Sequence, residues 1–382
     1  MKLAGLVLAL VGVAPAADTP PEAAAAAVFG GLVRGEEPGL AVLVRQDGKT
    51  VFERCLGVRD LRSRDRIDPG TAFRLASVTK QLTATAVMLL ARDGKLRYED
   101  ALSDLVPSFP AYGKGIRVRH LLTHTSGLPD YEDLMAAAEK DRSPIWTAVR
   151  QIHDDEVLSL LRSATAGRFP PGTSWAYSNS GYVVLGLIVA RVSGKPFAEF
   201  LHERVFAPLR MDRTLVYERG RNEVASRALG HTREADAFRQ TDQSSTSATL
   251  GDGGVYSTLR DLAKWDAALH AGTLVSPAAM KPALTPVTLE DGSAPRWPAG
   301  PPSGENLSPG MAVAYGFGWF LDPWRGRPRM WHYGETIGFR TAIERFPDDR
   351  LTVVILANRS DLDPQALALQ VADSYLGHAA RR

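Results

Sequence analysis

Strand-like segments lie at both ends of this 382-residue chain, and mainly helical segments fill its middle. Residues 39–58 have the alternation of a hairpin around Asp47-Gly48, and further strand-like runs follow at 314–321, 329–333, 339–346 and 351–357. We therefore predict a mixed α/β architecture of the α+β type: one antiparallel sheet built from both ends of the chain and covered by the first and last helices. The sheet lobe comprises about residues 25–95 and 311–382. A helical lobe comprises about residues 96–310 and includes a helix predicted over 196–206. A groove between the lobes is the expected place for a small-molecule site.

The first sixteen residues have the features of a secretion signal. Lys2 supplies a positive start, residues 3–13 form a short apolar core, and Ala14-Pro15-Ala16 fits a small-x-small cleavage pattern. The apolar run is too short to span a bilayer, and no later run is longer. We predict that residues 1–16 are a signal peptide and that 17–382 form one domain. The domain is expected to be periplasmic or secreted, without stable membrane insertion.

Composition limits the partners of the chain. It carries 45 basic and 43 acidic residues, a formal net charge of +2, and no long run of lysine and arginine, so nucleic acid is not an expected partner. His120 and His124 are four residues apart, as metal ligands can be, but no carboxylate lies between them. No metal or other cofactor is predicted. A small molecule or a peptide is the expected substrate, and the oligomeric state stays open.

Ser77-Val78-Thr79-Lys80 opens a mostly apolar helix predicted over residues 78–92. Side chains three residues apart lie on one face of a helix, so Ser77 and Lys80 should be neighbours. A helix that is apolar on most sides is buried, and desolvation favours the neutral form of a lysine amine. Such an amine can accept the serine proton and activate the hydroxyl as a nucleophile. Because Ser-x-x-Lys also occurs by chance, the motif needs companions.

Companion motifs follow in order along the chain. Tyr177-Ser178-Asn179 lies between a Pro-Pro-Gly loop and a predicted helix, and His332-Tyr333-Gly334-Glu335 lies in a late strand. Further stretches are found at residues 120–128, 208–211, 251–258 and 315–319. Together these motifs resemble those of the penicillin-recognising serine hydrolases: class C β-lactamases, D-Ala-D-Ala carboxypeptidases and related esterases. The resemblance covers about residues 25–377 and implies a β-lactamase/transpeptidase-like fold.

The resemblance implies roles for the motif residues. Ser77 would be the nucleophile, and either Lys80 or Tyr177 the general base, because a cation beside a phenol favours phenolate. Which of the two accepts the proton stays open, since their titrations would be coupled. Asn179 would donate to the substrate carbonyl and help to fix Lys80. The backbone N–H groups of Ser77 and Glu335 would form an oxyanion hole, and Gly334 would let the strand approach the substrate closely.

One motif departs from the β-lactamase pattern. His332-Tyr333-Gly334 stands where class C β-lactamases carry Lys-Thr-Gly, and histidine occurs there in the peptidase and esterase relatives. Lysine is a permanent cation suited to a substrate carboxylate, whereas histidine is mostly neutral at pH 7. Tyr333 replaces a small hydroxyl residue, and Glu335 adds a negative charge. We expect His332, Gly334 and Glu335 to contact a substrate that is not an anionic β-lactam.

These observations predict an exported serine hydrolase that works through an acyl-enzyme on ester, D-peptide amide or β-lactam carbonyls. An esterase or D-peptidase is favoured. A penicillin-binding sensor that is acylated without turnover and a true class C-type β-lactamase are the alternatives, and an amine acceptor would make the protein a transferase. An inactive scaffold has no physical reason to keep Ser77, Lys80, Tyr177 and Asn179 together. The natural substrate is not encoded in any motif.

Overall fold

The computed structural model describes residues 19–299 and 308–379. The predicted signal peptide lies outside the described residues, as does part of the loop predicted over 292–310. Within the described part of the chain, no helix combines the length and the apolar character needed to cross a membrane.

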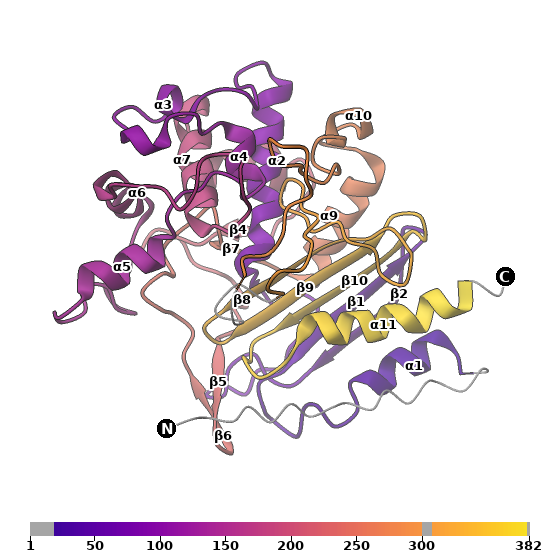
Figure 1. Cartoon of the computed structure of the whole chain (residues 1–382). Helices are drawn as coiled ribbons and strands as arrows, with labels where there is room; N and C mark the ends of the chain where they lie inside the picture. Colours follow the sequence, from indigo (N-terminus) through magenta and orange to yellow (C-terminus); the bar gives the residue numbers. More distant parts are fainter. Residues whose placement is uncertain (1–18, 300–307, 380–382) are drawn as a thin grey trace.

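A five-stranded antiparallel sheet joins the two ends of the chain (Figure 1). Its strand order is β2-β1-β10-β9-β8, with β1 at Leu40–Gln46, β2 at Lys49–Leu56, β8 at Met330–Thr336, β9 at Phe339–Phe346 and β10 at Leu351–Ala357. The N-terminal hairpin joins the C-terminal strands through β1 and β10, where Leu40 lies opposite Ala357. All seven residues of β10 are buried, as expected for a central strand covered on both faces. The structure confirms the prediction of one sheet assembled from both ends.

Two helices from opposite ends of the chain cover one face of this sheet, as Figure 1 shows: α1 (Pro21–Val28) and α11 (Pro364–Ala379). The side chains of β1 alternate between the two faces. Val42 packs with Phe29 and Val371 beneath these helices, whereas Leu43 belongs to the core shared with the helical lobe. The first and last helices therefore pack on the sheet as predicted.

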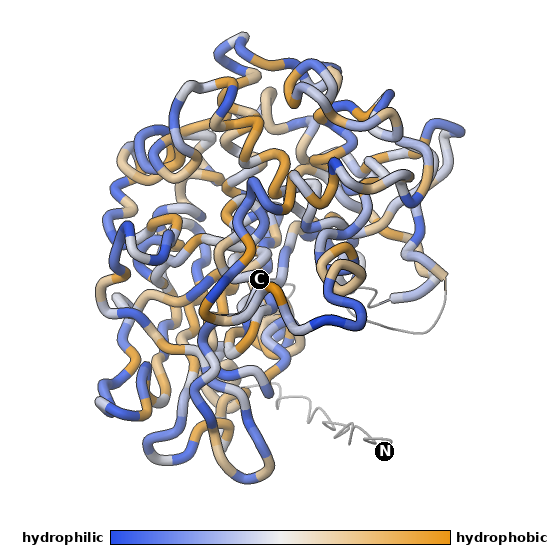
Figure 2. The backbone as a smooth tube through the Cα atoms, turned by 90° about the vertical axis from the view of Figure 1, so that its left-hand side faces the viewer, coloured by the Kyte–Doolittle hydropathy of each residue, from blue (hydrophilic) through white to orange (hydrophobic). Residues whose placement is uncertain are grey.

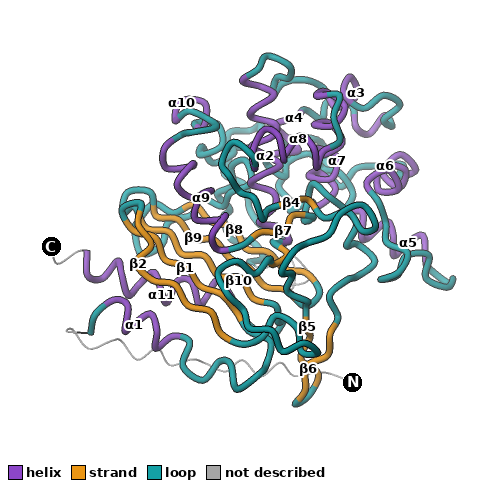
Figure 3. Tube along the Cα trace, turned by 180° about the vertical axis from the view of Figure 1, so that it is seen from behind, coloured by secondary structure: helices purple, strands orange, loops and turns teal. Residues whose placement is uncertain are grey.

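The helical lobe lies on the other face of the sheet (Figure 3). Its central helices are α2 (Thr79–Arg92) and α7 (Asn179–Ser193), which contact each other and are buried along most of their length. Around them lie α3 (Leu102–Leu105), α4 (Val118–Leu122), α5 (Tyr131–Glu139), α6 (Asp154–Ser163), α8 (Phe197–Leu201), α9 (Leu259–Ala271) and α10 (Pro277–Met280). Hydrophilic segments gather on the outer loops, and hydrophobic ones run through the interior (Figure 2).

Short strands also occur within the middle of the chain. A three-stranded sheet has the order β3-β7-β4, formed by β3 (Phe73–Arg74), β4 (Leu215–Val216) and β7 (Val255–Ser257), and a separate hairpin joins β5 (His231–Glu234) to β6 (Ala237–Gln240). The small sheet matters for the site because β3 leads directly into the turn that carries Ser77. The strand β7, which begins directly after Gly254, pairs with β3.

Two predicted elements differ from the structure. Residues 314–321 do not form a strand: Tyr315 and Phe320 share an isolated bridge, and Gly318 turns the chain with a φ of 77°. Tyr315 and Phe320 instead pack in a cluster with Trp175 and Trp331, whereas Phe317 and Trp319 belong to the main core. The helix predicted over 196–206 is α8 followed by a π-helical turn at His202–Phe206. In both cases tertiary packing overrides the local pattern.

Candidate active site

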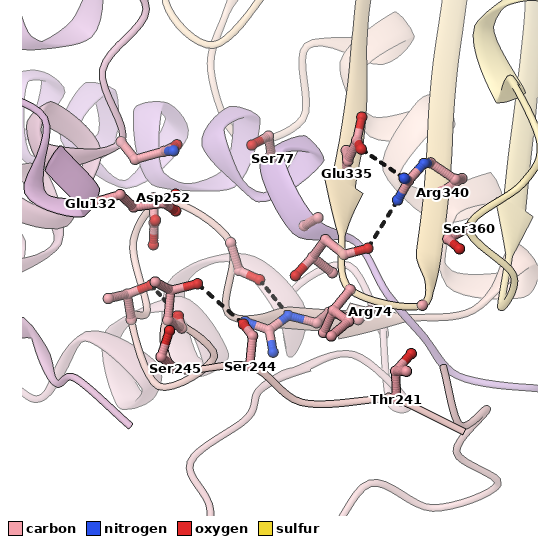
Figure 4. A pocket seen from close by; sticks show the side chains of 18 of the residues that line it. Arg74, Ser77, Glu132, Thr241, Ser244, Ser245, Asp252, Glu335, Arg340 and Ser360 are labelled. Carbon is pink, nitrogen blue, oxygen red and sulfur yellow. Dashed lines mark hydrogen bonds and ion pairs between the residues drawn. The ribbon is translucent and has the colours of Figure 1, made fainter. Parts of the chain in front are cut away.

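A cavity of about 680 Å³ lies where the sheet lobe meets the helical lobe, with Ser77 in its wall. Figure 4 shows Ser77 between two groups of charged side chains: Glu132 and Asp252 on one side, Glu335 and Arg340 on the other. Serine and threonine side chains from residues 241–249 line the wall below. The cavity is therefore predominantly polar near the candidate nucleophile.

Ser77 lies in a single 3-10 turn, Ala76–Val78, that joins β3 to α2. Lys80 is in the first turn of α2 and is fully buried. Its Nζ donates to Ser77 Oγ (2.9 Å), to Asn179 Oδ1 (2.7 Å) and to the carbonyl oxygen of Asp252 (3.1 Å). An ammonium group has three N–H donors, so these acceptors fit a charged Lys80. The structure thus brings Ser77, Lys80 and Asn179 together from segments about a hundred residues apart.

Tyr177 lies against the same lysine. Lys80 Nζ is 4.8 Å from the centre of the Tyr177 ring, and the tyrosine is only 6% exposed. Its loop ends at Ser178, whose Oγ accepts a hydrogen bond from the Gly181 N–H and so caps α7. The cap fixes where the helix begins, with Asn179 as its first residue and Tyr177 two residues earlier.

The strand β8 passes very close to the Ser77 turn. A Cβ atom added to Gly334 would lie 2.1 Å from the carbonyl oxygen of Leu75 and 3.1 Å from the backbone nitrogen of Ser77. Thr341 on the neighbouring strand fixes this approach by donating to the same Leu75 oxygen over 2.8 Å. Only glycine permits such proximity, and it places the backbone around Glu335 beside that of Ser77.

His332 is predicted to contact the substrate, but its position in the structure does not allow this contact. His332 is fully buried and does not line the cavity, whereas the adjacent Tyr333 does. Its Nδ1 is 2.6 Å from the carbonyl oxygen of Tyr333, which can only accept, so Nδ1 carries the proton and Nε2 accepts from Tyr315 (3.2 Å). Burial, reinforced by the charge of Lys80, lowers the pKa of His332 to about 3. His332 is thus a neutral residue beneath the site.

The carboxylates on the two sides of the cavity differ in their partners. Glu335 is paired with Arg340 over 2.6 Å, so the negative charge expected at this position is compensated. On the opposite side, desolvation raises the pKa of Glu132 to about 7, with further contributions from the carboxylates of Asp130 and Asp252. A positively charged group bound on this side of the cavity would stabilise the ionised carboxylates.

Sequence reasoning missed several residues that shape the site. The carbonyl oxygen of Asp252 holds Lys80, and no sequence pattern marks a backbone acceptor. Arg340 pairs with Glu335 across the turn between β8 and β9, and only the strand register brings them opposite. His124 packs against the ring of Tyr177. Among the described residues, no group of three or more His, Cys, Asp or Glu side chains is arranged to hold a metal ion.

Comparisons with known proteins extend over most of the chain. The family model described as Beta-lactamase matches residues 24–375. Penicillin-binding protein 4* of Bacillus subtilis is 30% identical over 350 residues, which cover 88% of this chain and 71% of that protein. A D-aminopeptidase of Cereibacter sphaeroides is 26% identical, covering 91% of this chain and 61% of that protein. The chain therefore spans less than two thirds of that relative's length.

Solved structures agree in fold. The octameric penicillin-binding protein homologue from Pyrococcus abyssi has a TM-score of 0.73 at 25% identity, covering 89% of this chain and 74% of that chain. D-amino acid amidase from Ochrobactrum anthropi has a TM-score of 0.74 at 23% identity, covering 94% and 99% respectively, which is a likeness of fold alone. These findings confirm the β-lactamase/transpeptidase-like fold, and with the family match they show that this chain belongs to the beta-lactamase family.

Proposed function

We propose that this protein is a serine hydrolase that removes an N-terminal D-amino acid from peptides or amides through an acyl-enzyme on Ser77. The observation that carries the proposal is the convergence of Ser77, Asn179 and the Tyr177 ring on the buried amine of Lys80. A serine hydroxyl needs an adjacent base to act as a nucleophile, and a buried amine or a phenol next to it can provide one.

The reaction follows from these positions. Ser77 Oγ attacks the substrate carbonyl carbon, and its proton passes to the Lys80–Tyr177 pair. The backbone N–H groups of Ser77 and Glu335 receive the negative charge that forms on the carbonyl oxygen. The C–N bond breaks as the pair returns the proton to the leaving amine. Water then attacks the Ser77 ester and gives a proton to the pair. The ester C–O bond breaks, the acid is released, and the pair returns the proton to Ser77 Oγ.

We assign the proton acceptance to Tyr177. Lys80 Nζ already contacts three acceptors, so it is arranged as a donor rather than as a base. A cation close to a phenol favours the phenolate form, which can accept the Ser77 proton. Lys80 then acts by its charge.

The substrate class is inferred from the relatives and from the cavity. One relative is named a D-aminopeptidase, and peptides cleaved by such an enzyme carry a free N-terminal ammonium. Glu132 and Asp252 provide carboxylates in the cavity wall that holds Ser77, on the side opposite the compensated Glu335. In contrast, the neutral and buried His332 supplies no cation for the carboxylate of a β-lactam. An esterase of the same mechanism is the nearest alternative.

A penicillin-binding sensor is a second candidate, favoured by the relative named penicillin-binding protein 4*. Such a protein would be acylated on Ser77 and would not release the product. A single burst of product and a stable mass adduct distinguish it from an enzyme that turns over.

We also propose that the protein is exported, on the strength of residues 1–16. Expression of the full chain followed by cell fractionation and N-terminal sequencing of the recovered protein tests this. A mature N-terminus near Ala17 outside the cytoplasm is expected, and full-length protein retained in the cytoplasm would contradict it.

The function is tested by labelling and by a substrate panel. A fluorophosphonate should add to the wild-type protein and to S360A, which lacks another serine of the same cavity, but not to S77A. D-Ala p-nitroanilide should be hydrolysed faster than L-Ala p-nitroanilide, N-acetyl-D-Ala p-nitroanilide and a chromogenic cephalosporin. Full hydrolysis by S77A would exclude the mechanism, and preference for the cephalosporin would exclude the substrate class.

A further inference from the structure

We propose that His124 is a positioning residue that fixes Tyr177 for proton transfer by holding the peptide groups on both sides of it. The inference rests on the proposed function, because it concerns the proton acceptor of that reaction. His124 lies in the loop after α4, is only 1% exposed, and does not line the cavity that contains Ser77.

Two hydrogen bonds connect His124 with the segment around Tyr177. The N–H of Ala176 donates to the carbonyl oxygen of His124 over 3.1 Å. The N–H of Ser178 donates to His124 Nδ1, also over 3.1 Å. A single residue therefore binds the amides immediately before and after Tyr177, one through its backbone and one through its side chain.

The imidazole ring also limits where the phenol ring can lie. The ring centres of His124 and Tyr177 are 4.4 Å apart at an interplanar angle of 31°. Tyr315 and Tyr182 pack on the imidazole at 4.6 and 5.2 Å, so the histidine cannot retreat from Tyr177 without displacing buried rings. The tyrosine is thus confined between this packing and Lys80, whose Nζ lies 4.8 Å from its centre.

The backbone of His124 is held in a left-handed conformation, with φ of 60°. Non-glycine residues adopt it uncommonly, and histidine and asparagine tolerate it better than most. The next residues continue the attachment: the carbonyl oxygen of Thr125 accepts from the N–H of Gly172 over 2.8 Å, and that of Gly127 accepts from Arg168 over 2.7 Å. The loop from 124 to 127 therefore holds the whole segment that ends at Tyr177.

His124 acts through geometry and not through charge. Its Nδ1 accepts a bond from a backbone N–H, so the proton of the neutral ring lies on Nε2. Burial lowers the pKa of His124 well below its usual value, and the charge of Lys80 and the proximity of His332 lower it further. The titratable groups that face it from the surrounding elements are Lys80, His332 and the tyrosines 177, 182 and 315, and the ring of Trp175 packs on it edge-on. Protonation at Nδ1 would break the bond to Ser178.

A positioning role and a merely structural role differ in what they change. Misplacing a catalytic group by about 1 Å can lower the rate of a reaction about 100-fold without loss of fold. A structural role would lower the amount of folded protein but leave the rate of each folded molecule unchanged. The rate must therefore be expressed per active site, counted by titration with a fluorophosphonate.

Two substitutions separate the acceptor from the ring. H124N keeps an acceptor close to the position of Nδ1 and tolerates the positive φ, whereas H124L has a similar size and no acceptor. We expect H124L to lower kcat per titrated site about 100-fold with KM changed by less than about threefold, and H124N to recover to within about tenfold of the wild type. Equal losses in both variants, or an unchanged kcat in H124L, would overturn the hydrogen-bonding role.

A double-mutant cycle with Y177F tests whether His124 acts through Tyr177. In the Y177F background, H124L should change kcat less than about twofold, because the group that it positions is absent. Losses that multiply in the double variant would overturn the inference while leaving the proposed function intact. Full activity of Y177F would refute the role of Tyr177 and with it this inference, whereas full activity of S77A would refute the proposed function itself.

Discussion

Substitution of Gly334 by alanine should move β8, which carries Glu335, away from the turn that carries Ser77. The added Cβ would lie 2.1 Å from the Leu75 carbonyl oxygen and 2.4 Å from Thr341 Oγ1. Carbon and oxygen atoms that are not bonded to each other require more than 3 Å, so β8 must move away from the Ser77 turn by about 1 Å. Because Leu75 O belongs to the backbone and also accepts from Thr341, no flexible side chain can absorb the displacement.

The expected cost follows from that distance. A shift of about 1 Å in the position of a reacting group can lower a rate about 100-fold, and loss of one oxyanion donor costs about 3 kcal/mol of barrier. We expect G334A to acylate with a fluorophosphonate 100- to 1,000-fold more slowly, on the order of these two effects. Stopped-flow labelling measures the rate, and thermal unfolding of the same sample reports whether the variant is folded.

Gly253 offers a matched control. It lines the same cavity, but a Cβ atom there would meet its nearest heavy atom, in Ala76, at 3.6 Å, which is an ordinary contact. G253A should label within about threefold of the wild type, because nothing has to move. Wild-type labelling by G334A would show that β8 need not approach Ser77 so closely, and equal losses in both variants would show that the effect is not specific to the oxyanion side.

Three further predictions concern charge. K80M should lower the acylation rate on the order of 10³-fold, with the folded fraction followed by thermal unfolding; a loss below tenfold would contradict its role. The KM for D-Ala p-nitroanilide should fall as pH rises through about 7, where Glu132 ionises, and E132Q should abolish that trend but leave the acetylated substrate unaffected. The pKa of His332 falls from 6.5 to about 3 on folding. As the pH falls, His332 is therefore protonated in the unfolded chain before it is protonated in the folded one, and the free energy of unfolding decreases from pH 6.5 towards pH 3. H332Q should flatten that loss in chemical unfolding measured across this range, and an unchanged slope would contradict the burial argument.

The sheet could be predicted from the sequence because its strands carry strong local signals. Residues 339–346 and 351–357 form β9 and β10 with the predicted bounds, since β10 is almost entirely apolar and the turn at Asp348-Asp349 separates the two strands. Residues 314–321 also alternate, yet Tyr315 and Phe320 pack in a cluster that includes Trp175 and Trp297 from distant segments. Alternation records which side chains are buried, and it does not record whether the partner is a strand or a set of rings.

The grouping of the candidate catalytic residues could be predicted because each lies in a motif whose order along the chain resembles that of known hydrolases. The contacts that hold these residues in place could not be predicted. Lys80 depends on the carbonyl oxygen of Asp252, and Tyr177 on His124, and both contacts join segments more than fifty residues apart. His332 illustrates the same limit, since its motif suggested a substrate contact and its burial beneath Tyr333 follows only from the register of β8.

Burial keeps the two histidines next to Tyr177 neutral and leaves the ammonium of Lys80 as the charge that lies against its ring. The ring centres of His124 and His332 are 4.4 and 6.1 Å from that of Tyr177. Desolvation lowers the pKa of both histidines, so both are neutral and neither adds a positive charge to that of Lys80. In an environment of low dielectric one ammonium acts more strongly than it would in water. The same burial removes any permanent cation from the position where a lysine would face a substrate carboxylate. Under the proposed function, these neutral rings would leave Lys80 to activate Ser77 and would offer no cation to an anionic substrate, so a cation introduced at His332 should alter activation and specificity together.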